Sequence, residues 1–233
     1  MNAENRASSF NHPTGNDNVE SVAIVALGPT NADYHRAMIP HEPAIPEVDE
    51  VWAINTGVRS TRADLAFIMD DLETMARRSE RYRIELSALE VPIITSEHDE
   101  TTRRINPDAT QYPLADVIEW WGRRFLEQRS GEFSTGAQRA AGLEIASYLH
   151  NSIPYVLAYA AFIGVRNIYL FGADYTFPGM AAREDDRANA EYWVGMVRGA
   201  GVRVLVPERT TLLNTQRGRW FYGFARQPNL WGS

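Results

Sequence analysis

The sequence contains no cysteine among its 233 residues. This absence excludes disulfide bridges, thiolate metal ligands and a cysteine nucleophile, and it is typical of proteins from a reducing compartment. The sequence also lacks an apolar run of the roughly 18 residues that span a bilayer, and its amino terminus lacks the apolar region of a signal peptide. We therefore expect a cytoplasmic protein that does not bind a membrane.

A surplus of positive charge is missing as well. The formal net charge is −7 at pH 7, so the chain has no overall attraction to nucleic acid or to an anionic membrane. Contact with a polyanion would need a local basic patch. With 44% hydrophobic and 23% charged residues, the chain is nevertheless typical of a globular protein, and its length favours one domain.

The two ends of the chain differ in composition from its middle. Residues 1–18 are rich in Asn, Ser, Glu and Gly and predict a mobile tail, whereas residues 19–215 predict the folded domain. Residues 216–233 mix arginine with aromatic residues, a combination that binds nucleic acid in some proteins and folds back onto its own domain in others. The residues that would contact DNA in the first case are Arg217, Arg219, Trp220 and Arg226.

Short apolar runs that alternate with helical patterns predict an α/β fold. The expected strands are residues 21–27, 50–55, 65–69, 91–95, 167–171 and 202–206. The expected helices are residues 31–38, 72–82, 114–128, 153–163 and 188–200. Strands and helices in this order favour a doubly wound, mostly parallel, Rossmann-like sheet with right-handed crossovers.

Small or polar residues follow each of the first three expected strands. They are Gly28, Pro29 and Thr30 after the first strand, Asn55 and Thr56 after the second, and Asp70 and Asp71 after the third. Because ligands bind outside the carboxyl ends of parallel strands, we expect a shared crevice there. The first group resembles a phosphate-binding loop in front of a helix, although the same residues also form ordinary turns.

Two interpretations of Asp70 and Asp71 stay open. One is a cap for the helix that follows, since aspartate accepts hydrogen bonds from the first free backbone amides of a helix. The other is chemistry, either as a base or as hard oxygen ligands for Mg²⁺ or Mn²⁺. The pair does not form a D-x-D motif, so the residues do not firmly predict a metal.

Residues 151–177 form the most informative stretch. They predict a helix, a tight turn and a buried strand that ends in Gly172, Asp174 and Tyr175. Ser152 is the expected N-cap of the helix, and the same helix start could hold an anion. We expect Asp174 and its neighbours to line the crevice.

Two further segments are expected to lack long elements of secondary structure. Arg103 and Arg104 fall in a polar stretch that extends to about Pro113 and is interpreted as a lid or an acceptor-binding loop. Residues 133–136 predict a hydroxyl-rich turn before a short segment.

These motifs carry a family resemblance. The sequence resembles the Rossmann-like superfamily of bacterial Cst-II-type sialyltransferases in three motifs. They are a strand ending in Gly-Pro-Thr, a second strand ending in W-A-I-N, and the run NS-x-P-Y-x4-A-x3-G-x3-I-Y-L-x-G-x-D-Y. DUF115 proteins, namely flagellin-glycosylation accessory factors and archaeal 6-hydroxymethylpterin diphosphokinases, are similar. The resemblance covers residues 21–214 and is most specific in residues 151–175. Phages often encode such proteins, so it implies a bacterial or phage-infected cell.

The resemblance implies a nucleotide-donor site. It places the nucleotide and phosphate loop on Gly28, Pro29 and Thr30. A nucleotide contact falls on Asn55, with Thr56 beside it. The pair of residues that opens the helix falls on Asn151 and Ser152, and the Gly-x-Asp turn falls on Gly172 and Asp174.

The sequence also departs from the sialyltransferase pattern at three points. Thr176 stands where those enzymes have a tyrosine that assists the leaving phosphate, and Leu27 replaces an asparagine of the first loop. No histidine follows His150, whereas their general base is a later histidine. We therefore predict glycosyl transfer in a general sense rather than sialyl transfer.

The predicted function is that of a glycosyltransferase that moves a sugar from a nucleotide-sugar donor to an unknown acceptor hydroxyl, a modified base in phage DNA being one candidate. The candidates for the base are Asp70, Asp71 and Asp174. Candidates for stabilising the leaving phosphate are Arg183, Arg187 and Tyr175. The alternatives are an ATP-dependent pyrophosphokinase of the 6-hydroxymethylpterin type and a non-catalytic nucleotide-binding phage protein.

Overall fold

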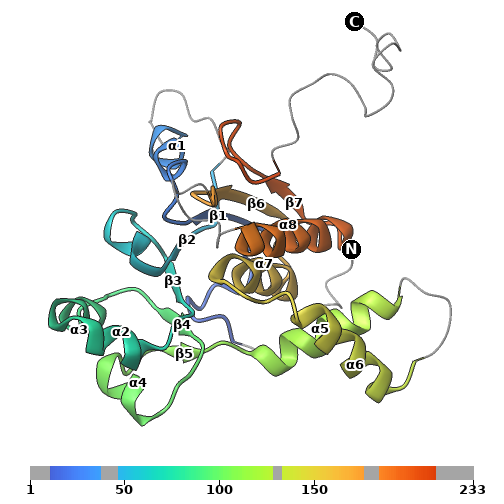
Figure 1. The fold of residues 1–233 in the computed structure, drawn as a ribbon, viewed down its shortest axis with the longest axis horizontal. Helices are drawn as coiled ribbons and strands as arrows, with labels where there is room; N and C mark the ends of the chain where they lie inside the picture. Colours follow the sequence, from blue (N-terminus) through green and yellow to red (C-terminus); the bar gives the residue numbers. More distant parts are fainter. Residues whose placement is uncertain (1–10, 38–46, 128–132, 176–183, 214–233) are drawn as a thin grey trace, which may run out of the picture.

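A parallel seven-stranded sheet runs through the centre of the computed structural model, which describes residues 11–37, 47–127, 133–175 and 184–213 (Figure 1). Its order is β5-β4-β3-β2-β1-β6-β7, and every neighbouring pair is parallel. The strands are β1 (Ser21–Val25), β2 (Glu50–Ile54), β3 (Leu65–Ile68), β4 (Ile93–Thr95), β5 (Thr110–Gln111), β6 (Asn167–Phe171) and β7 (Arg203–Leu205). The predicted single α/β domain with a doubly wound sheet is confirmed.

The strand order reverses at β1. Strands β2 to β5 follow one another on one side of β1, and the chain then crosses to the other side, where β6 pairs with β1 in register from Ser21 and Asn167 onward. In open α/β sheets, ligands bind outside the carboxyl ends of the strands next to such a reversal. A ligand site is therefore expected at the carboxyl ends of β1 and β6.

Helices cover both faces of the sheet (Figure 1). One layer contains α5 (Leu114–Glu127), α6 (Thr135–Ala146), α7 (Ser152–Ile163) and α8 (Glu184–Gly199). The other contains α1 (Asn31–Ala37), α2 (Leu72–Arg78), α3 (Glu80–Ser87) and α4 (Glu100–Ile105). Alternate residues of β1 serve the two layers, since Ile24 packs with the first and Val25 with the second. No helix within the described ranges is long and apolar enough to cross a membrane.

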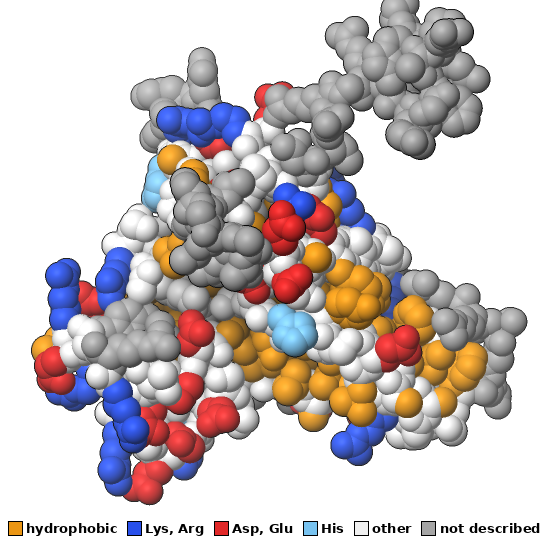
Figure 2. Space-filling model, viewed as in Figure 1, with side chains coloured by type: hydrophobic (Ala, Val, Ile, Leu, Met, Phe, Trp, Pro, Cys, Tyr) orange, Lys and Arg blue, Asp and Glu red, His pale blue; other side chains and the backbone are white. Residues whose placement is uncertain are grey.

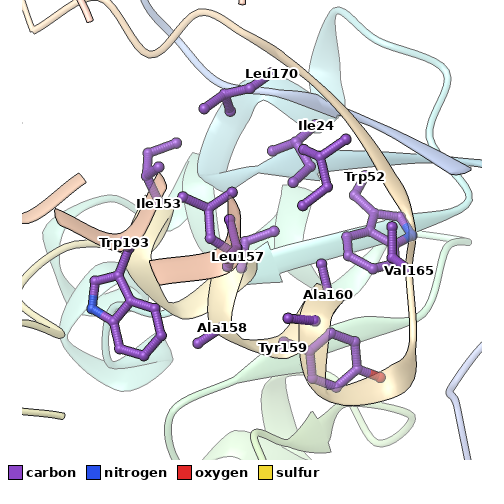
Figure 3. Packing of buried hydrophobic residues seen from close by; sticks show 14 of the residues in the cluster. Ile24, Trp52, Ile153, Leu157, Ala158, Tyr159, Ala160, Val165, Leu170 and Trp193 are labelled. Carbon is purple, nitrogen blue, oxygen red and sulfur yellow. The ribbon is translucent and has the colours of Figure 1, made fainter. Parts of the chain in front are cut away.

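Helix α7 forms the centre of the larger core. Leu157, Ala160 and their neighbours pack against the sheet beside Ile24 and Trp52 (Figure 3). The ring of Tyr159 lies 5.8 Å from that of Trp52. The helix ends at Gly164, whose φ of 95° is left-handed and suits a residue without Cβ. The apolar character all round α7 follows from this central position.

Residues 11–18 contact the core, although their composition predicts a tail. Nδ1 of His12 lies 2.7 Å from the Tyr159 hydroxyl, and Nε2 lies 2.9 Å from Oε2 of Glu50. The indole N–H of Trp52 donates to the same carboxylate at 2.7 Å. Burial raises the pKa of Glu50, but the hydrogen bonds from His12, Thr14 and Trp52 outweigh it and leave that pKa below its usual range. Residues 1–10 of the predicted tail 1–18 and the whole predicted segment 216–233 lie outside the described residues.

A helix occupies a stretch that was expected to be a loop. Arg103 and Arg104 belong to α4, because Asp99 accepts a hydrogen bond from the amide of Thr102 at 2.8 Å and Ile105 is buried. The expectation of a loop from Arg103 to Pro113 was therefore wrong. The short strand β5 then follows α4 at the edge of the sheet.

Helix α6 was expected only as a short segment after a turn. Its N-cap is Ser134, whose hydroxyl oxygen accepts from the amide of Ala137 at 3.3 Å. A Cβ on Gly142 would lie 2.1 Å from the carbonyl oxygen of Ile118 in α5, so the two helices are in direct backbone contact. The small residues of α6 thus allow it to pack closely against α5. Because alanine and glycine make this contact in place of large apolar residues, the sequence of α6 shows no strong helical period of apolar residues.

The predicted helix over residues 72–82 is interrupted. Ser79 has an extended backbone with φ of −160°, and the chain divides there into α2 and α3. Helix α8 begins at Glu184, four residues before the expected start. The acidic first turn of α8 favours this earlier start, because negative side chains stabilise the amino-terminal end of a helix.

Candidate functional site

Two glycines join the loops that follow β1 and β6. The amide of Gly28 donates to the carbonyl oxygen of Gly172 at 2.7 Å, which continues the contact between the strands beyond their ends. A Cβ on Gly28 would lie 2.5 Å from that oxygen and 2.6 Å from Oδ2 of Asp174. Gly172 has φ of 71°, and its Cβ would meet the carbonyl of Ala26 at 2.3 Å. Both positions therefore require glycine.

Asp174 and Thr30 lock the same two loops together. Asp174 is 3% exposed, and its Oδ2 accepts from the amide of Thr30 at 2.6 Å. The Thr30 hydroxyl lies 2.9 Å from both carboxylate oxygens and accepts from the amide of Gly172 at 3.0 Å. These contacts give Asp174 the geometry of a positioning group for the β1 loop (residues 26–31). Its role as a base stays a prediction.

Asn151 and Tyr175 connect the β6 loop (residues 172–175) to the start of α7. The Tyr175 hydroxyl donates to Oδ1 of Asn151 at 2.8 Å, and the amide of Ile153 donates to the same oxygen at 3.2 Å. Asn151 is thus the N-cap, and Ser152, which was expected in that role, is the first residue of the helix. Nδ2 of Asn151 also donates to the carbonyl of Asp186 in α8 at 3.0 Å.

Asn55 has two unusual features at the end of β2. Its φ of 51° is left-handed, a conformation that asparagine tolerates better than most residues. Its Oδ1 is buried and has no hydrogen-bond partner in the described part of the chain. Buried carbonyl oxygens of this kind are nearly always paired in native proteins, with water or a ligand where protein donors are missing. Thr56 follows it and is half-buried.

Left-handed backbone recurs at this edge of the sheet. Tyr175, in the loop that follows β6, has φ of 51°, as Asn55 has directly after β2. Such residues cost of order 1–3 kcal/mol each and cluster at ligand sites. The strands β2 and β6 flank β1 on its two sides. The two strained residues therefore bracket the β1 loop.

The loop that follows β7 (residues 206–213, the β7 loop) also reaches this edge. The hydroxyl of Thr211 donates to the backbone carbonyl of Asp174, and Arg209 forms an ion pair with Asp33 of α1. No function was predicted for this loop from the sequence. The signal was available, since the loop after any parallel strand lies at the same edge as the loops after its neighbours.

The fold is similar to that of the sialyltransferase CstII. A structure of CstII from Campylobacter jejuni in complex with the substrate analogue CMP-3FNeuAc has a TM-score of 0.44 and 15% sequence identity over 80% of this chain and 79% of that chain. The complex of CstII with cytidine-5'-monophosphate has a TM-score of 0.42 and 16% identity over 84% and 81%. No protein-family model and no curated protein match the sequence. The predicted resemblance is thus confirmed for the fold, and likeness at this level does not determine a reaction.

Asp70 and Asp71 lie to one side of this arrangement. They follow β3, which is two strands from β1, or about 10 Å at the usual strand spacing. Asp71 caps α2 by accepting from the amide of Glu73 at 2.9 Å and from the Thr74 hydroxyl at 2.7 Å. The Thr74 bond is the main cause of the lowered pKa of Asp71. The capping interpretation therefore accounts for Asp71, and Asp70 is exposed beside it.

Several predicted groups are not tested by the structure. Arg183 and the tail residues Arg217, Arg219, Trp220 and Arg226 lie outside the described residues. Arg187 is described and lies 3.7 Å from Glu191, an ion pair within α8. Within the described ranges, no group of three or more His, Asp or Glu side chains could hold a metal ion.

One arginine in each of α2, α3 and α4 pairs with an acidic side chain of the same helix, in a region where blue and red side chains intermingle (Figure 2). Arg77 pairs with Glu73, Arg83 with Glu80 and Arg104 with Glu100. Pairing of this kind along a helix is typical of a solvated face. The arginines that pair in this way do not add up to the local basic patch that contact with a polyanion would need.

Proposed function

We propose that the chain is a glycosyltransferase that binds a nucleotide-sugar donor across the carboxyl ends of β1, β2 and β6. The observation that carries the proposal is the clamp between Thr30 and Asp174 at the reversal of strand order. Gly28 and Gly172 let the two loops pack closely there, at the ends of the strands where folds of this class bind phosphate ligands. The sequence resemblance to nucleotide-dependent transferases points to the same edge.

The donor's phosphate would lie between the β1 loop and the start of α7. The free amides at the start of a helix carry partial positive charge, which favours an anion near Asn151 and Ser152. The buried Oδ1 of Asn55 would accept a hydrogen bond from an amino or hydroxyl group of the nucleoside, which removes the cost of leaving that oxygen unpaired. Tyr175 already donates to Asn151, so it would reach the leaving phosphate only by breaking that bond.

In the proposed reaction, an acceptor hydroxyl oxygen bonds to the anomeric carbon as the bond from that carbon to the donor phosphate breaks. The electron pair of the broken bond leaves with the phosphate, and the hydroxyl proton passes to a base. Among the three candidate aspartates, Asp70 fits the role of the base better than Asp71 or Asp174 does. Asp71 is engaged as a cap, and the carboxylate of Asp174 faces Thr30. A metal at Asp70 is not required by these steps.

A thermal-unfolding screen with CMP-, UDP-, GDP-, ADP- and dTDP-sugars tests the proposal. A donor at one hundred times its Kd stabilises a protein by about 2.7 kcal/mol, which corresponds to roughly 5–10 °C for a chain of this size. Asn55→Ala is expected to weaken the response, because the buried acceptor is then missing. The absence of a shift with any donor at millimolar concentration would contradict the proposal.

The same material separates the two alternatives. A pyrophosphokinase would release AMP from ATP in the presence of Mg²⁺ and a pterin-like alcohol. A non-catalytic binding protein would bind a nucleotide with the same affinity in the wild type and in Asp174→Asn, and neither form would turn over.

A further inference from the structure

Arg209 belongs to the β7 loop, which lies at the same end of the sheet as α1 (Figure 1). Its guanidinium pairs with Asp33 of α1, and the two residues are 176 positions apart in the sequence. The Arg209 side chain is 60% exposed, whereas that of Asp33 is 18% exposed. The cation is thus held at the surface by a carboxylate that lies mostly beneath it.

The loop beneath Arg209 is anchored at several points. The amide of Thr210 donates to the carbonyl of Pro207 at 3.1 Å, which closes a turn around Arg209. The amide of Leu212 donates to the Thr210 hydroxyl at 3.2 Å, and the Leu212 side chain is buried in the core. Thr211 is bonded to the carbonyl of Asp174. A group carried on such a turn is held in place before a ligand arrives.

The charges around Arg209 connect it to the clamp. A hydrogen bond and the negative charge of Asp33 raise the pKa of Arg209, and the charge of Asp174 adds to the effect. Within the described residues, the carboxylate of Asp174 accepts hydrogen bonds from Thr30 alone, and both of these donors are neutral. Arg209 is therefore a cation that is close enough to Asp174 to interact with it electrostatically. It also lies beside the β1 loop, where the proposed donor phosphate would lie.

We propose that Arg209 is the phosphate-binding cation of this site and that its guanidinium pairs with Asp33 until the anion displaces that carboxylate. This inference rests on the proposed function only in taking the donor to be a phosphate ester. A guanidinium presents a planar set of donors that matches two phosphate oxygens, and it keeps its charge at any physiological pH. Asp33 competes with the phosphate for the same donors, so Arg209 favours binding of the anion and Asp33 opposes it.

Titration calorimetry with inorganic pyrophosphate tests this assignment without a known donor. Arg209→Gln is expected to weaken binding by roughly tenfold, because a charge-assisted hydrogen bond is lost at a partly solvated site. Asp33→Asn is expected to strengthen binding by about threefold, because a competing negative charge is removed while side-chain size is kept. The loss with Arg209→Gln should shrink at high salt.

Arg36→Gln is the matched control. Arg36 pairs with the same Asp33 oxygen at 3.0 Å and its side chain is 65% exposed, so this variant removes one arginine from the same carboxylate. Binding should stay within about twofold of the wild type, since Arg36 is carried by α1 and its ion pair in the described structure is with Asp33 of the same helix.

The signs of the two effects decide the outcome. If the ion pair only fastens α1 to the β7 loop, Arg209→Gln and Asp33→Asn break the same contact and shift binding in the same direction, which overturns the inference. Unchanged affinity in Arg209→Gln, or a wild type that does not bind pyrophosphate, also overturns it. The two variants could change pyrophosphate affinity in opposite directions while no nucleotide sugar stabilises the protein. In that case the assignment of Arg209 is supported and the proposal of glycosyl transfer is wrong.

Discussion

Among the residues that the structure describes, one buried carboxylate lies at each end of the sheet, and the two have different hydrogen-bond partners. Glu50, at the amino-terminal end of β2, and Asp174, beyond the carboxyl end of β6, are both 3% exposed. Glu50 accepts from side chains that belong to the packed interior, including the indole of Trp52. Asp174 accepts from the backbone and hydroxyl of a single loop residue, Thr30.

The surroundings of the two carboxylates explain the difference. Around Glu50 the rings of His12, Trp52 and Tyr159 fill the space, so the network closes the amino-terminal end of the core. Around Asp174 the chain has glycine contacts and left-handed residues, so the same degree of burial fixes loops whose outer side can receive a ligand. A buried carboxylate therefore indicates that the surrounding groups are held in fixed positions. The identity of its hydrogen-bond partners shows whether that arrangement contributes to stability or to binding.

The largest effect should come from breaking the amino-terminal network. In Glu50→Gln an NH2 group replaces one of the two carboxylate oxygens, so an acceptor is lost either for Thr14 or for Trp52 and His12. We expect the free energy of unfolding to fall by about 3 kcal/mol, as when one partner of a buried pair is removed. Urea denaturation measures the loss. Pyrophosphate affinity of the folded protein should not change.

Glu47→Gln is the control for that variant, because it makes the same substitution at an exposed glutamate three residues away. Its effect should stay within about 0.5 kcal/mol. Equal effects of the two variants would show that the contacts of Glu50 contribute nothing specific, and a loss of binding in Glu50→Gln would end the contrast between the two ends.

A smaller loss of stability with a larger loss of binding is expected from Gly28→Ala. The added methyl group would overlap the carbonyl of Gly172 and a carboxylate oxygen of Asp174, and neither can move freely. We expect a cost of about 2 kcal/mol in unfolding free energy and a fall in pyrophosphate affinity. Denaturation and calorimetry on the same preparation measure both quantities.

Gly195→Ala offers the opposite result as a control. Gly195 lies in α8, and a Cβ there would meet nothing within 4 Å. Alanine should therefore stabilise the helix by about 0.5–1 kcal/mol. If Gly28→Ala binds pyrophosphate as well as Gly195→Ala does, the β1 loop is not part of the anion site.

What could be predicted from the sequence follows the same division between local and distant contacts. Six of the seven strands of the sheet were predictable because each lies in a short, mostly apolar run, as β6 does. Strand β5 was missed because it consists of two polar residues, Thr110 and Gln111. Helix α6 was missed because its Ala and Gly residues acquire meaning only against α5. Asn151 and Ser152 both suit an N-cap, so their order could not be decided from residue type. Contacts between residues far apart, such as Arg209 with Asp33 or His12 with Tyr159, leave no local pattern at all.

The smallest effect concerns acid. Hydrogen bonds to Glu50 hold its pKa below the usual range, so the folded state binds a proton there less readily than the unfolded chain does. The stability that this provides is complete above the unfolded pKa, about 4.3, and is lost as pH falls through the lower folded value. The difference in unfolding free energy between the wild type and Glu50→Gln should therefore be constant from pH 6 to 8 and should shrink below about pH 4. Parallel urea titrations across that range measure it. A difference that grows on acidification would contradict the lowered pKa of Glu50 and the network of donors that explains it.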